Sequence, residues 1–588
     1  MLQPCVWERR RSEPEAVSRL AAELRVPPVI AHLLWLRGLV TPEAASRFLA
    51  PRLEHLHDPM ALTGMAAAVD RVLAAIARRE KVAIHGDYDV DGITSTVILH
   101  RAIEMFGGDV MHFIPERLRH GYGLQVEAIE RLHAAGARLV ISVDCGIRSR
   151  DAARRARELG VDLVITDHHE PEDELPPALA VLNPKRHDCP YPDKHLAGVG
   201  VALKLVQALC GRFDRLKLLP GFVKVAALGT LADVVPLVGE NRVIAKLGLE
   251  RLSNGPHTVG LQALLDGCGL TGRTLDSYHV GFVLGPRINA AGRMSTPDIA
   301  TRLLLAVGEE FTDEARSLAS QLNAENTRRQ EEEASTLALA RRAVQQDPAI
   351  GAHNVLVVAG EGWHRGVIGI VASKLADAFR KPAVVISVED GVAHGSCRSI
   401  PVFDMLAALE RCADLFVRFG GHRQAAGLTM DPARIPELRA RLADHADAVL
   451  SPDDLRARVY LDAALPLPAI TPDVIEQLRR LAPFGNGNPK PVFEASPVEI
   501  VGGPTTMKDR HLSMTVRQEG RVFRAVAWRA SEHLAVLQAN RTGLELAYHV
   551  ERNEYRGEST VELNVCDIQL QRRAPEAAPA VASPAAAS

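Results

Sequence analysis

From about residue 61, short runs rich in β-branched residues alternate with stretches of helical spacing. Strands are predicted at 81–86, 111–115, 137–144 and 161–167. The helices predicted between them span 92–106, 125–135 and 150–159. Neighbouring parallel strands need a helical crossover of this kind. The alternation therefore predicts an α/β lobe with a parallel sheet and helices on both of its faces.

The rest of the chain divides by composition, since 588 residues exceed one ordinary domain. A stretch rich in Glu, Arg, Gln and Ala predicts one long helix, and strand-like runs at 354–360 and 381–387 indicate a second, smaller α/β lobe. The alternating run 513–528 indicates hairpin strands of a β-barrel or β-sandwich. The predicted parts are a helical segment 1–60, the parallel-sheet lobe 61–308, a connecting helix 309–347, the smaller lobe 348–450, the β domain 451–572 and a disordered tail 573–588.

An acidic motif, His85-Gly-Asp-Tyr-Asp-Val-Asp-Gly92, directly follows the first predicted strand and opens a helix. Its three carboxylates lie within five residues and repel one another, and a divalent cation is the usual compensation. The motif also resembles the start of an EF-hand. However, position 12 would be Ile98 where calcium binding requires Glu, and a strand precedes the motif. A solvated acidic turn is a further interpretation, because Asp and Gly are common in turns.

Further acidic and imidazole groups follow later apolar runs. Asp144 ends one predicted strand, Asp167-His168-His169 ends the next, and Asp233 follows the apolar run 228–232. Ligands bind outside the carboxyl ends of parallel strands, at the topological switch point, so at least three of these four motifs should meet at one edge. His169 fits a direct metal ligand and a hydrogen-bonding support equally well.

This set of ligands indicates the kind of metal and of reaction. Asp and His without Cys favour Mn²⁺ or Mg²⁺, with zinc as an alternative, and the number of ligands predicts two ions. Two ions clamp the attacking and leaving oxygens when a phosphodiester or phosphoanhydride is hydrolysed.

Whole-chain charge does not indicate a nucleic-acid partner, because 69 basic and 72 acidic residues leave a net charge of -3. The eight cysteines are scattered without a C-x-x-C pair, so neither a disulfide framework nor a zinc ribbon is predicted. Residues 1–10 lack the apolar core of a signal peptide, and no apolar run approaches the ~20 residues of a membrane helix. We therefore expect a reduced, cytoplasmic protein with no membrane span.

Longer motifs carry a family resemblance. HGDYDVDG (85–92), VDCG (143–146), DHH (167–169) and LADVVP (231–236) resemble the four motifs of the DHH phosphoesterase superfamily. Gly-Gly-His at 420–422 resembles the signature of the DHH-associated domain. The resemblance narrows to the RecJ family through GPRINAAGRM (285–294), GWHRGVIGIVASKL (362–375), GSCRS (395–399) and PFGNGNP (483–489). It covers about residues 30–570.

The resemblance implies a metal-dependent exonuclease that degrades single-stranded DNA from the 5′ end, releases 5′-mononucleotides and acts in recombination and repair. It also implies two lobes joined by a long helix and a β domain that is a DNA-binding OB-fold. By motif match the metal ligands would be Asp87, Asp89, Asp91, Asp144, His168 and Asp233. His85 and His169 would complete or support the shell and, with Asp144, are the expected catalytic residues.

Cations and a ring near the metals would hold the DNA. Arg117 follows a predicted strand, and Tyr122 between two glycines offers a stacking ring. Arg287 and Arg293 lie in a Gly-rich stretch that is expected to approach phosphate closely. The remaining expected contacts are Ser396 and Arg398, in a predicted turn that resembles the family's pocket for the 5′-terminal phosphate, and His422.

The predicted β domain contains a local basic run. Residues 508–529 hold six basic side chains against two acidic ones, a balance of +4. In a strand, Phe523 faces away from Arg524 and Trp528, so at least one of the two aromatic rings is expected in the core. Arg521 and Arg524 are the expected contacts with single-stranded DNA.

Two other classes of function fit part of this pattern. Another DHH phosphoesterase, acting on short RNA, cyclic dinucleotides or pyrophosphate, would not need the OB-like domain. A non-catalytic single-strand-binding replication scaffold would not need the complete acidic set. A monomer is expected, because an enclosed path through two lobes would work within one chain. The family works with a single-strand-binding protein and a RecQ-type helicase, and no residue here establishes either contact.

Overall fold

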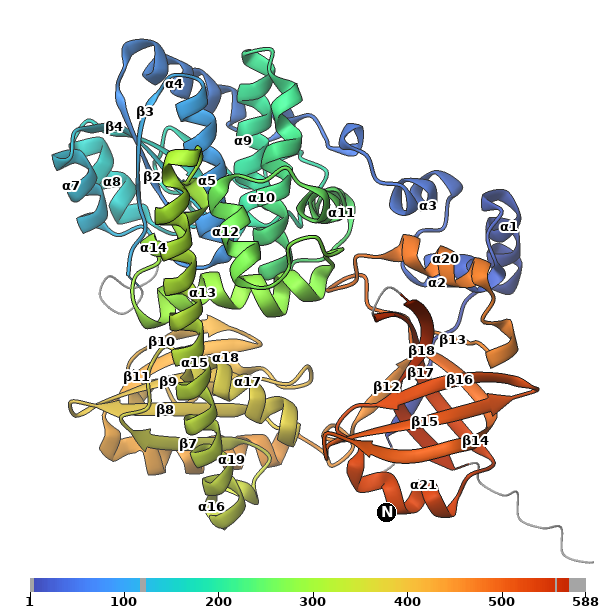
Figure 1. The fold of residues 1–588 in the computed structure, drawn as a ribbon. Coiled ribbons are helices and arrows are strands. Elements are labelled where there is room, and N and C mark those ends of the chain that lie inside the picture. The colour runs from blue at the N-terminus through green and yellow to red at the C-terminus, as the bar shows by residue number, and fades with distance from the viewer. Residues whose placement is uncertain (1–4, 117–122, 556–557, 571–588) are drawn as a thin grey trace, which may run out of the picture. The chain divides into compact units, whose positions relative to one another are not determined.

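The computed structural model describes residues 5–116, 123–555 and 558–570 (Figure 1). The chain forms two compact units. The smaller unit combines Met1–Ser46, Arg456–Leu481 and Lys490–Ser588, and the larger combines Arg47–Leu455 and Ala482–Pro489. The predicted disordered tail 573–588 lies outside the described residues, and the predicted domain boundaries stay predictions.

A five-stranded parallel sheet forms the centre of the first lobe of the larger unit. Its order is β3-β2-β4-β5-β6, and every pairing is parallel. Because β2 lies between β3 and β4, the strand order reverses there, which makes the β2/β4 boundary the topological switch point. The strands are β2 (Lys81–His85), β3 (Asp109–Phe113), β4 (Ala137–Val143), β5 (Asp162–Thr166) and β6 (Ala180–Leu182).

Helices cover both faces of this sheet, as predicted. Side chains alternate along each strand, so Val82 and Ile84 pack with one helical layer and Ala83 with the other. The first layer contains α4 (Met65–Arg78), α5 (Val90–Met105), α9 (Gly198–Arg212), α10 (Leu219–Ala232) and α11 (Gly239–Asn254). The second layer contains α7 (Val126–Ala134) and α8 (Arg150–Glu158).

The long helix α15 (Thr312–Gln346) connects the two lobes of the larger unit (Figure 1). On the side of the first lobe it packs against α12 (Val259–Gly267), α13 (Gly285–Met294) and α14 (Asp298–Leu305). On the side of the second lobe it packs against α16 (Pro348–Gly351), α17 (Ile368–Phe379) and β7 (Leu356–Glu361). The charged stretch therefore forms the predicted connecting helix.

The second lobe contains a mixed sheet of order β10-β11-β9-β8-β7, in which only β7 and β8 are parallel. Its other strands are β8 (Ala383–Glu389), β9 (Val392–Arg398), β10 (Phe416–His422) and β11 (Ala425–Met430), and its other helices are α18 (Met405–Glu410) and α19 (Ile435–Val449). The GSCRS segment was predicted as a turn, and this is wrong for its Ser396 and Arg398. Both lie in β9, which pairs with strands on both sides.

A closed β-barrel dominates the smaller unit. Its strands follow the order β13-β14-β15-β16-β18-β17, and a further pairing of β14 with β17 closes it. They are β13 (Ala463–Ala464), β14 (Phe493–Met507), β15 (His511–Gln518), β16 (Arg521–Ala527), β17 (Leu544–Tyr555) and β18 (Glu558–Leu570), with helices α20 (Pro472–Leu481) and α21 (Leu534–Ala539). The structure thus selects the barrel over the sandwich.

The N-terminal segment was predicted as wholly helical, and this is wrong for its first residues. Its helices are α1 (Pro14–Leu24), α2 (Pro28–Leu36) and α3 (Pro42–Leu49). Before them, β1 (Val6–Arg9) pairs in parallel with β12 (Arg458–Leu461). The strand has four residues and takes its partner from a segment far along the chain, so no local pattern reveals it.

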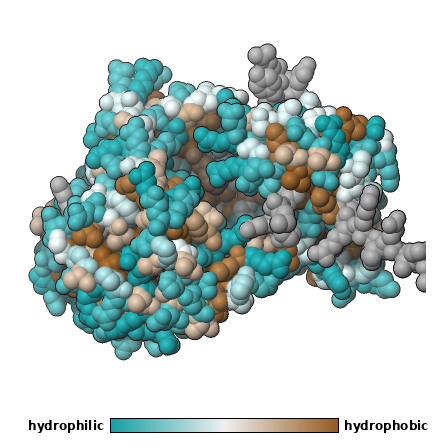
Figure 2. All heavy atoms as spheres, turned by 90° about the horizontal axis from the view of Figure 1, so that it is seen from below, coloured by the Kyte–Doolittle hydropathy of each residue, from teal (hydrophilic) through white to brown (hydrophobic). Residues whose placement is uncertain are grey.

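Hydrophobic residues lie mainly in the cores. On the face shown in Figure 2, hydrophilic residues predominate and hydrophobic ones form small separate patches. Within the described ranges, no single helix has the length and apolar character to cross a membrane. One sharply bent pair, Leu53–Ala61 with Met65–Arg78, meets the criterion by length and composition alone.

Candidate metal centre and its surroundings

The loops that follow β2, β4 and β5 meet at the carboxyl edge of the parallel sheet. The turn after β2 is ordered by Asp89, whose side chain caps α5 by accepting hydrogen bonds from the N–H groups of Asp91 (2.9 Å) and Gly92 (3.1 Å). Asp144 follows β4 directly with φ of 59°, a left-handed conformation uncommon outside Gly, Asn and Asp. Its N–H donates to the carbonyl of Thr166 at 2.9 Å, which holds this loop against the end of β5.

All six expected metal ligands come together at this edge. They form overlapping groups in which one ligand atom of each residue lies within 4.8 Å of the others. These groups are Asp87 with Asp89 and Asp144, Asp91 with His168 and Asp233, and Asp144 with His168 and His169. Because the first two groups share no member, the geometry has room for two ions, and Asp144 and His168 link them.

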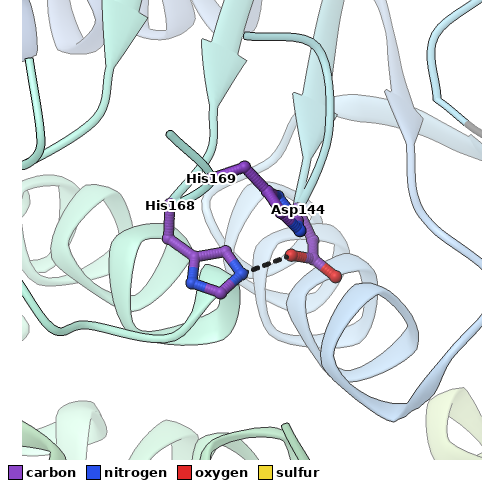
Figure 3. A group of neighbouring side chains, drawn as sticks. All are labelled: Asp144, His168 and His169. Carbon is purple, nitrogen blue, oxygen red and sulfur yellow. Dashed lines mark ion pairs between the residues drawn. The ribbon is translucent and has the colours of Figure 1, made fainter. Parts of the chain in front are cut away.

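Two buried atoms face each other at ion-pair distance but form no hydrogen bond. Nε2 of His168 lies 3.2 Å from Oδ1 of Asp144 (Figure 3), yet neither atom has a hydrogen-bond partner among the described residues. Nε2 of His168 also lies 3.9 Å from Asp91 and 3.7 Å from Asp233. Buried polar atoms are almost always satisfied, so an imidazole nitrogen aimed into three carboxylates indicates a cation between them.

The electrostatics point the same way. Burial, reinforced by the charges of Asp91 and Asp89, raises the pKa of Asp144 well above its usual range and that of Asp233 to about 9. Burial lowers the pKa of His168 to about 3, so its ring is neutral and able to bind a metal. The chain therefore presents buried acids with too little positive charge of its own, and Mn²⁺ or Mg²⁺ fits this set.

Asp91 is held by the start of α9. Its two oxygens accept hydrogen bonds from the N–H groups of Gly198 (2.7 Å) and Val199 (2.8 Å). Gly198 is required here, because a Cβ at this position would lie 2.5 Å from Oδ1 of Asp144. Burial followed by the charge of Asp89 raises the pKa of Asp91 to about 7, although the two N–H groups oppose this.

The two histidines expected to be catalytic, His85 and His169, differ in their surroundings. His85 ends β2 and is buried, its Nδ1 lies 3.6 Å from Sγ of Cys145, and its Nε2 has no hydrogen-bond partner in the described structure. Burial lowers the pKa of His85 to about 4. Nδ1 of His169 lies 2.8 Å from Oδ1 of Asp167. Burial opposes protonation of His169, but the hydrogen bond and charge of Asp167 outweigh it and raise the pKa of His169.

Asp167 itself was not among the predicted site residues. It is fully buried and accepts hydrogen bonds from the N–H groups of Ile147, His168 and His169 as well as from the His169 ring. Burial alone would raise the pKa of Asp167, but these hydrogen bonds lower it. Asp167 therefore orders the loop and orients His169.

Asn183 and Lys185 were also missed. Asn183 directly follows β6, donates to the carbonyl of His169 at 2.9 Å and accepts from the N–H of Lys185 at 2.8 Å. The Lys185 ammonium lies 3.0 Å from Glu170, and its charge lowers the pKa of Asp233, although burial dominates that shift. Asp144 was predicted because ligands bind outside the carboxyl ends of parallel strands. The same rule applies to Asn183, which also follows a strand of this sheet.

Arg287 and Arg293 were expected in a glycine-rich stretch open to phosphate, but both lie on helix α13. Arg287 donates to Asn323 at 2.6 Å, and Arg293 donates to the carbonyl of Gly366 at 3.1 Å. Gly292 serves packing, because a Cβ there would lie 2.7 Å from the Tyr88 carbonyl oxygen. Gly292 thus lets α13 approach the backbone of Tyr88 closely, and the expected DNA contacts of Arg287 and Arg293 stay predictions.

The remaining expected DNA contacts lie in several places. Ser396 and Arg398 lie near the first turn of α17, and His422 is an exposed residue at the end of β10. Burial, followed by the charges of Arg148 and His169, lowers the pKa of His422, so this residue lies near the first lobe. Arg117 and Tyr122 lie outside the described residues.

In the smaller unit, acidic side chains from neighbouring strands offset part of the positive charge of the basic run 508–529. Phe523 is buried and Trp528 is 57% exposed, as the alternation predicted for one of the two. Arg524 pairs with Glu562 of β18 at 2.8 Å, and Arg517 pairs with Glu499 of β14 at 2.5 Å. Counting charge along one segment omitted these acids, which neighbouring strands supply.

Comparison with known proteins is consistent with this architecture. Three family models match the chain: the DHH family, N-terminal domain at residues 81–230, the DHHA1 domain at 352–447 and the RecJ OB domain at 461–567. The single-stranded-DNA-specific exonuclease RecJ of Dickeya dadantii is 35% identical over 581 residues, which cover 94% of this chain and 97% of that relative. The chain belongs to the RecJ family. The resemblance inferred from the motifs is thereby confirmed.

Two further relatives extend this result. RecJ of Bacillus subtilis is 39% identical over 531 residues, which cover 90% of this chain but 66% of that longer relative. The crystal structure of RecJ from Thermus thermophilus in complex with Mn²⁺ matches with a TM-score of 0.82 and 33% identity, covering 98% of this chain and 81% of that one. The predicted fold, a DHH lobe followed by a DHH-associated lobe and an OB-fold, is therefore confirmed.

Proposed function

We propose that the chain is a metal-dependent exonuclease that hydrolyses single-stranded DNA from the 5′ end and releases 5′-mononucleotides. The observation that carries the proposal is the convergence of Asp144, His168 and four further carboxylates. Two of the buried ligand atoms face each other without a hydrogen-bond partner among the described residues. RecJ relatives named as single-stranded-DNA-specific exonucleases support the substrate, and the Mn²⁺ complex of one of them supports the metal.

In this proposal two ions, Mn²⁺ or Mg²⁺, occupy the two independent groups of ligands. Asp87, Asp89 and Asp144 hold one ion, and Asp91, His168 and Asp233 hold the other. When bound, such a pair supplies hydroxide near neutral pH and charge for the phosphoryl oxygens. The described ligands then fix where the scissile phosphate lies.

The protein's own groups do the remaining work. Asp167 orients His169 so that its other ring nitrogen can donate to a phosphate oxygen as negative charge develops. His85 supports the metal ligands from the protein interior, because it is buried at the end of β2. Ser396 and Arg398 bind the 5′-terminal phosphate, and His422 donates to a phosphate. The remaining DNA contacts are Arg117, Tyr122, Arg287, Arg293, Arg521 and Arg524.

End-labelled DNA tests the polarity. Single strands carrying the label at the 5′ or the 3′ end are incubated with the full chain and Mn²⁺, beside the matching duplex. We expect early release of labelled mononucleotide from the 5′-labelled strand only, and little release from duplex. Equal digestion from both ends would contradict the polarity, and preferred cleavage of cyclic dinucleotides would favour another DHH phosphoesterase.

Removing one basic side chain from the barrel should flatten the salt dependence of DNA binding. Arg521 has no ion pair in the described ranges, so Arg521→Ala is expected to lower the slope of log affinity against log salt by about 0.7. Arg524→Ala should change the slope less, because Glu562 already competes for its guanidinium. Fluorescence anisotropy over a salt series measures this, and Arg479→Ala outside the run is the control. An unchanged slope for Arg521→Ala would show that this arginine does not touch the phosphates.

The same proposal covers the cellular setting. The protein acts in the cytoplasm in recombination and repair, as a monomer, beside a single-strand-binding protein and a RecQ-type helicase. Its support is membership of the RecJ family. Sedimentation of the pure protein with and without each partner tests the monomer and the contacts.

A further inference from the structure

The first turn of α11 carries polar side chains that the proposed chemistry does not use. Glu240, Asn241 and Arg242 are all buried, with exposed fractions of 1%, 0% and 2%. Burying three polar side chains in succession is costly unless each is hydrogen-bonded. Their partners therefore show what this turn holds in place.

Glu240 anchors the turn in the core. Its carboxylate accepts hydrogen bonds from Nζ of Lys204 (2.8 Å), the N–H of His57 (3.0 Å) and the hydroxyl of Tyr191 (2.6 Å). Its own N–H donates to Asp193 at 2.8 Å. Four contacts from three segments, one of which supplies both Tyr191 and Asp193, fix the start of α11. The neighbouring Asn241 side chain therefore has a defined position.

Asn241 uses that position to join two loops. Its Oδ1 accepts from the N–H of Ala197 at 3.4 Å, and its Nδ2 donates to the carbonyls of His195 (2.5 Å) and Pro236 (3.1 Å). The loop 195–197 leads into α9, and Pro236 lies three residues after Asp233. One amide therefore links the segment before α9 to the segment after Asp233.

These loops support every member of one ligand group. The N–H groups of Gly198 and Val199, directly after the first loop, hold Asp91. His168 lies close to the backbone of Leu196 within that loop. Asp233 begins the second loop. The group Asp87, Asp89 and Asp144 follows the ends of β2 and β4, and the hydrogen bonds of Asn241 among the described residues do not reach those loops.

We propose that Asn241 is a positioning residue for one of the two metal positions, the one formed by Asp91, His168 and Asp233. This inference rests on the proposed two-ion site. Its amide sets the spacing of the three ligands by fixing the loops behind them, as outer hydrogen bonds do at other metal sites. Loss of the amide should weaken the binding of one ion and leave the binding of the other unchanged.

Manganese binding tests this on the full-length chain. Free Mn²⁺ is followed by electron paramagnetic resonance during titration of the wild type and of Asn241→Ala. The wild type should bind two ions. Asn241→Ala should bind one ion with unchanged affinity and the other about 10- to 100-fold more weakly. Turnover of single-stranded DNA should recover at high Mn²⁺, with KM for DNA unchanged.

Controls separate positioning from general destabilisation. Asn326→Ala removes another buried asparagine, on α15, and should leave both manganese affinities unchanged even where the melting temperature falls. Asn241→Ser, which keeps a hydroxyl, should fall between the wild type and alanine and serves if alanine prevents folding. Two ions bound with wild-type affinity in the Asn241 variants would overturn the role of Asn241 alone. A single ion in the wild type would overturn the two-ion site itself.

Discussion

Asp144→Asn is expected to abolish turnover and, at the same time, to raise the melting temperature of the metal-free protein. Oδ1 of Asp144 is buried, has no hydrogen-bond partner among the described residues and lies among the charges of Asp91, Asp89 and Asp87. Without a cation this repulsion opposes folding, so a neutral amide of the same shape relieves it. With Mn²⁺ present the variant should lose most of the stabilisation that the ion gives the wild type.

The loss of activity should be large. A metal ion supplies several kcal/mol of charge stabilisation in a transition state, and about 4 kcal/mol corresponds to roughly a thousandfold in rate. Single-turnover cleavage of 5′-labelled single strands measures the rate, and thermal unfolding with and without Mn²⁺ measures stability.

Asp167→Asn is the matched control, because it should lower the stability of the metal-free protein, whereas Asp144→Asn should raise it. This buried carboxylate accepts hydrogen bonds from Ile147, His168 and His169, which lower its pKa, so the charged form is already satisfied. Its substitution should destabilise the metal-free protein by about 1–3 kcal/mol, whereas Asp144→Asn stabilises it. If metal-free Asp144→Asn melts at a lower temperature than the metal-free wild type, repulsion within the acidic cluster does not oppose folding, and the argument for a cation site there fails.

The sequence was most informative where strand order decides position. Asp144 and His168 are far from Asp87 in the chain, yet each follows a strand of one parallel sheet, so their meeting follows from topology. Asp233 joins them by a different route, since it ends helix α10 and not a strand. The apolar run before it identified a buried element without revealing its type, because helices and strands can both be wholly apolar.

Contacts between distant segments could not be predicted in this way. Glu562 and Glu499 neutralise two arginines of the barrel from neighbouring strands, which a count along one segment cannot detect. The glycines near Arg287 and Arg293 suggested a close approach to phosphate, but they lie in a helix, where Gly292 packs closely against Tyr88. Asn241 carries no local signal at all, because its partners are backbone groups of two other loops.

Arg398→Ala is expected to remove the advantage of a 5′-phosphorylated strand over one with a 5′-hydroxyl. NH1 of Arg398 donates to the Cys397 carbonyl at 2.7 Å and lies 3.3 Å from Oγ of Ser396. A Cβ at Gly369, in the first turn of α17, would lie 3.0 Å from Oγ of Ser396 and 3.3 Å from NH2 of Arg398. The start of a 12-residue helix thus faces a guanidinium and a hydroxyl, which together suit a phosphate.

Arg398→Ala should remove a charge-assisted hydrogen bond to the phosphate, which is worth about 1.5–3 kcal/mol. The value of kcat/KM on the phosphorylated strand should therefore fall by roughly 10- to 100-fold. The same variant should cleave the 5′-hydroxyl strand at nearly the wild-type rate, since that strand never used the contact. Arg380→Ala, at the opposite end of α17, is the matched control and should preserve the preference. Equal losses on both strands would instead mean that Arg398 supports β9 or the metal centre. That outcome would leave the proposed 5′ polarity without a phosphate site to explain it.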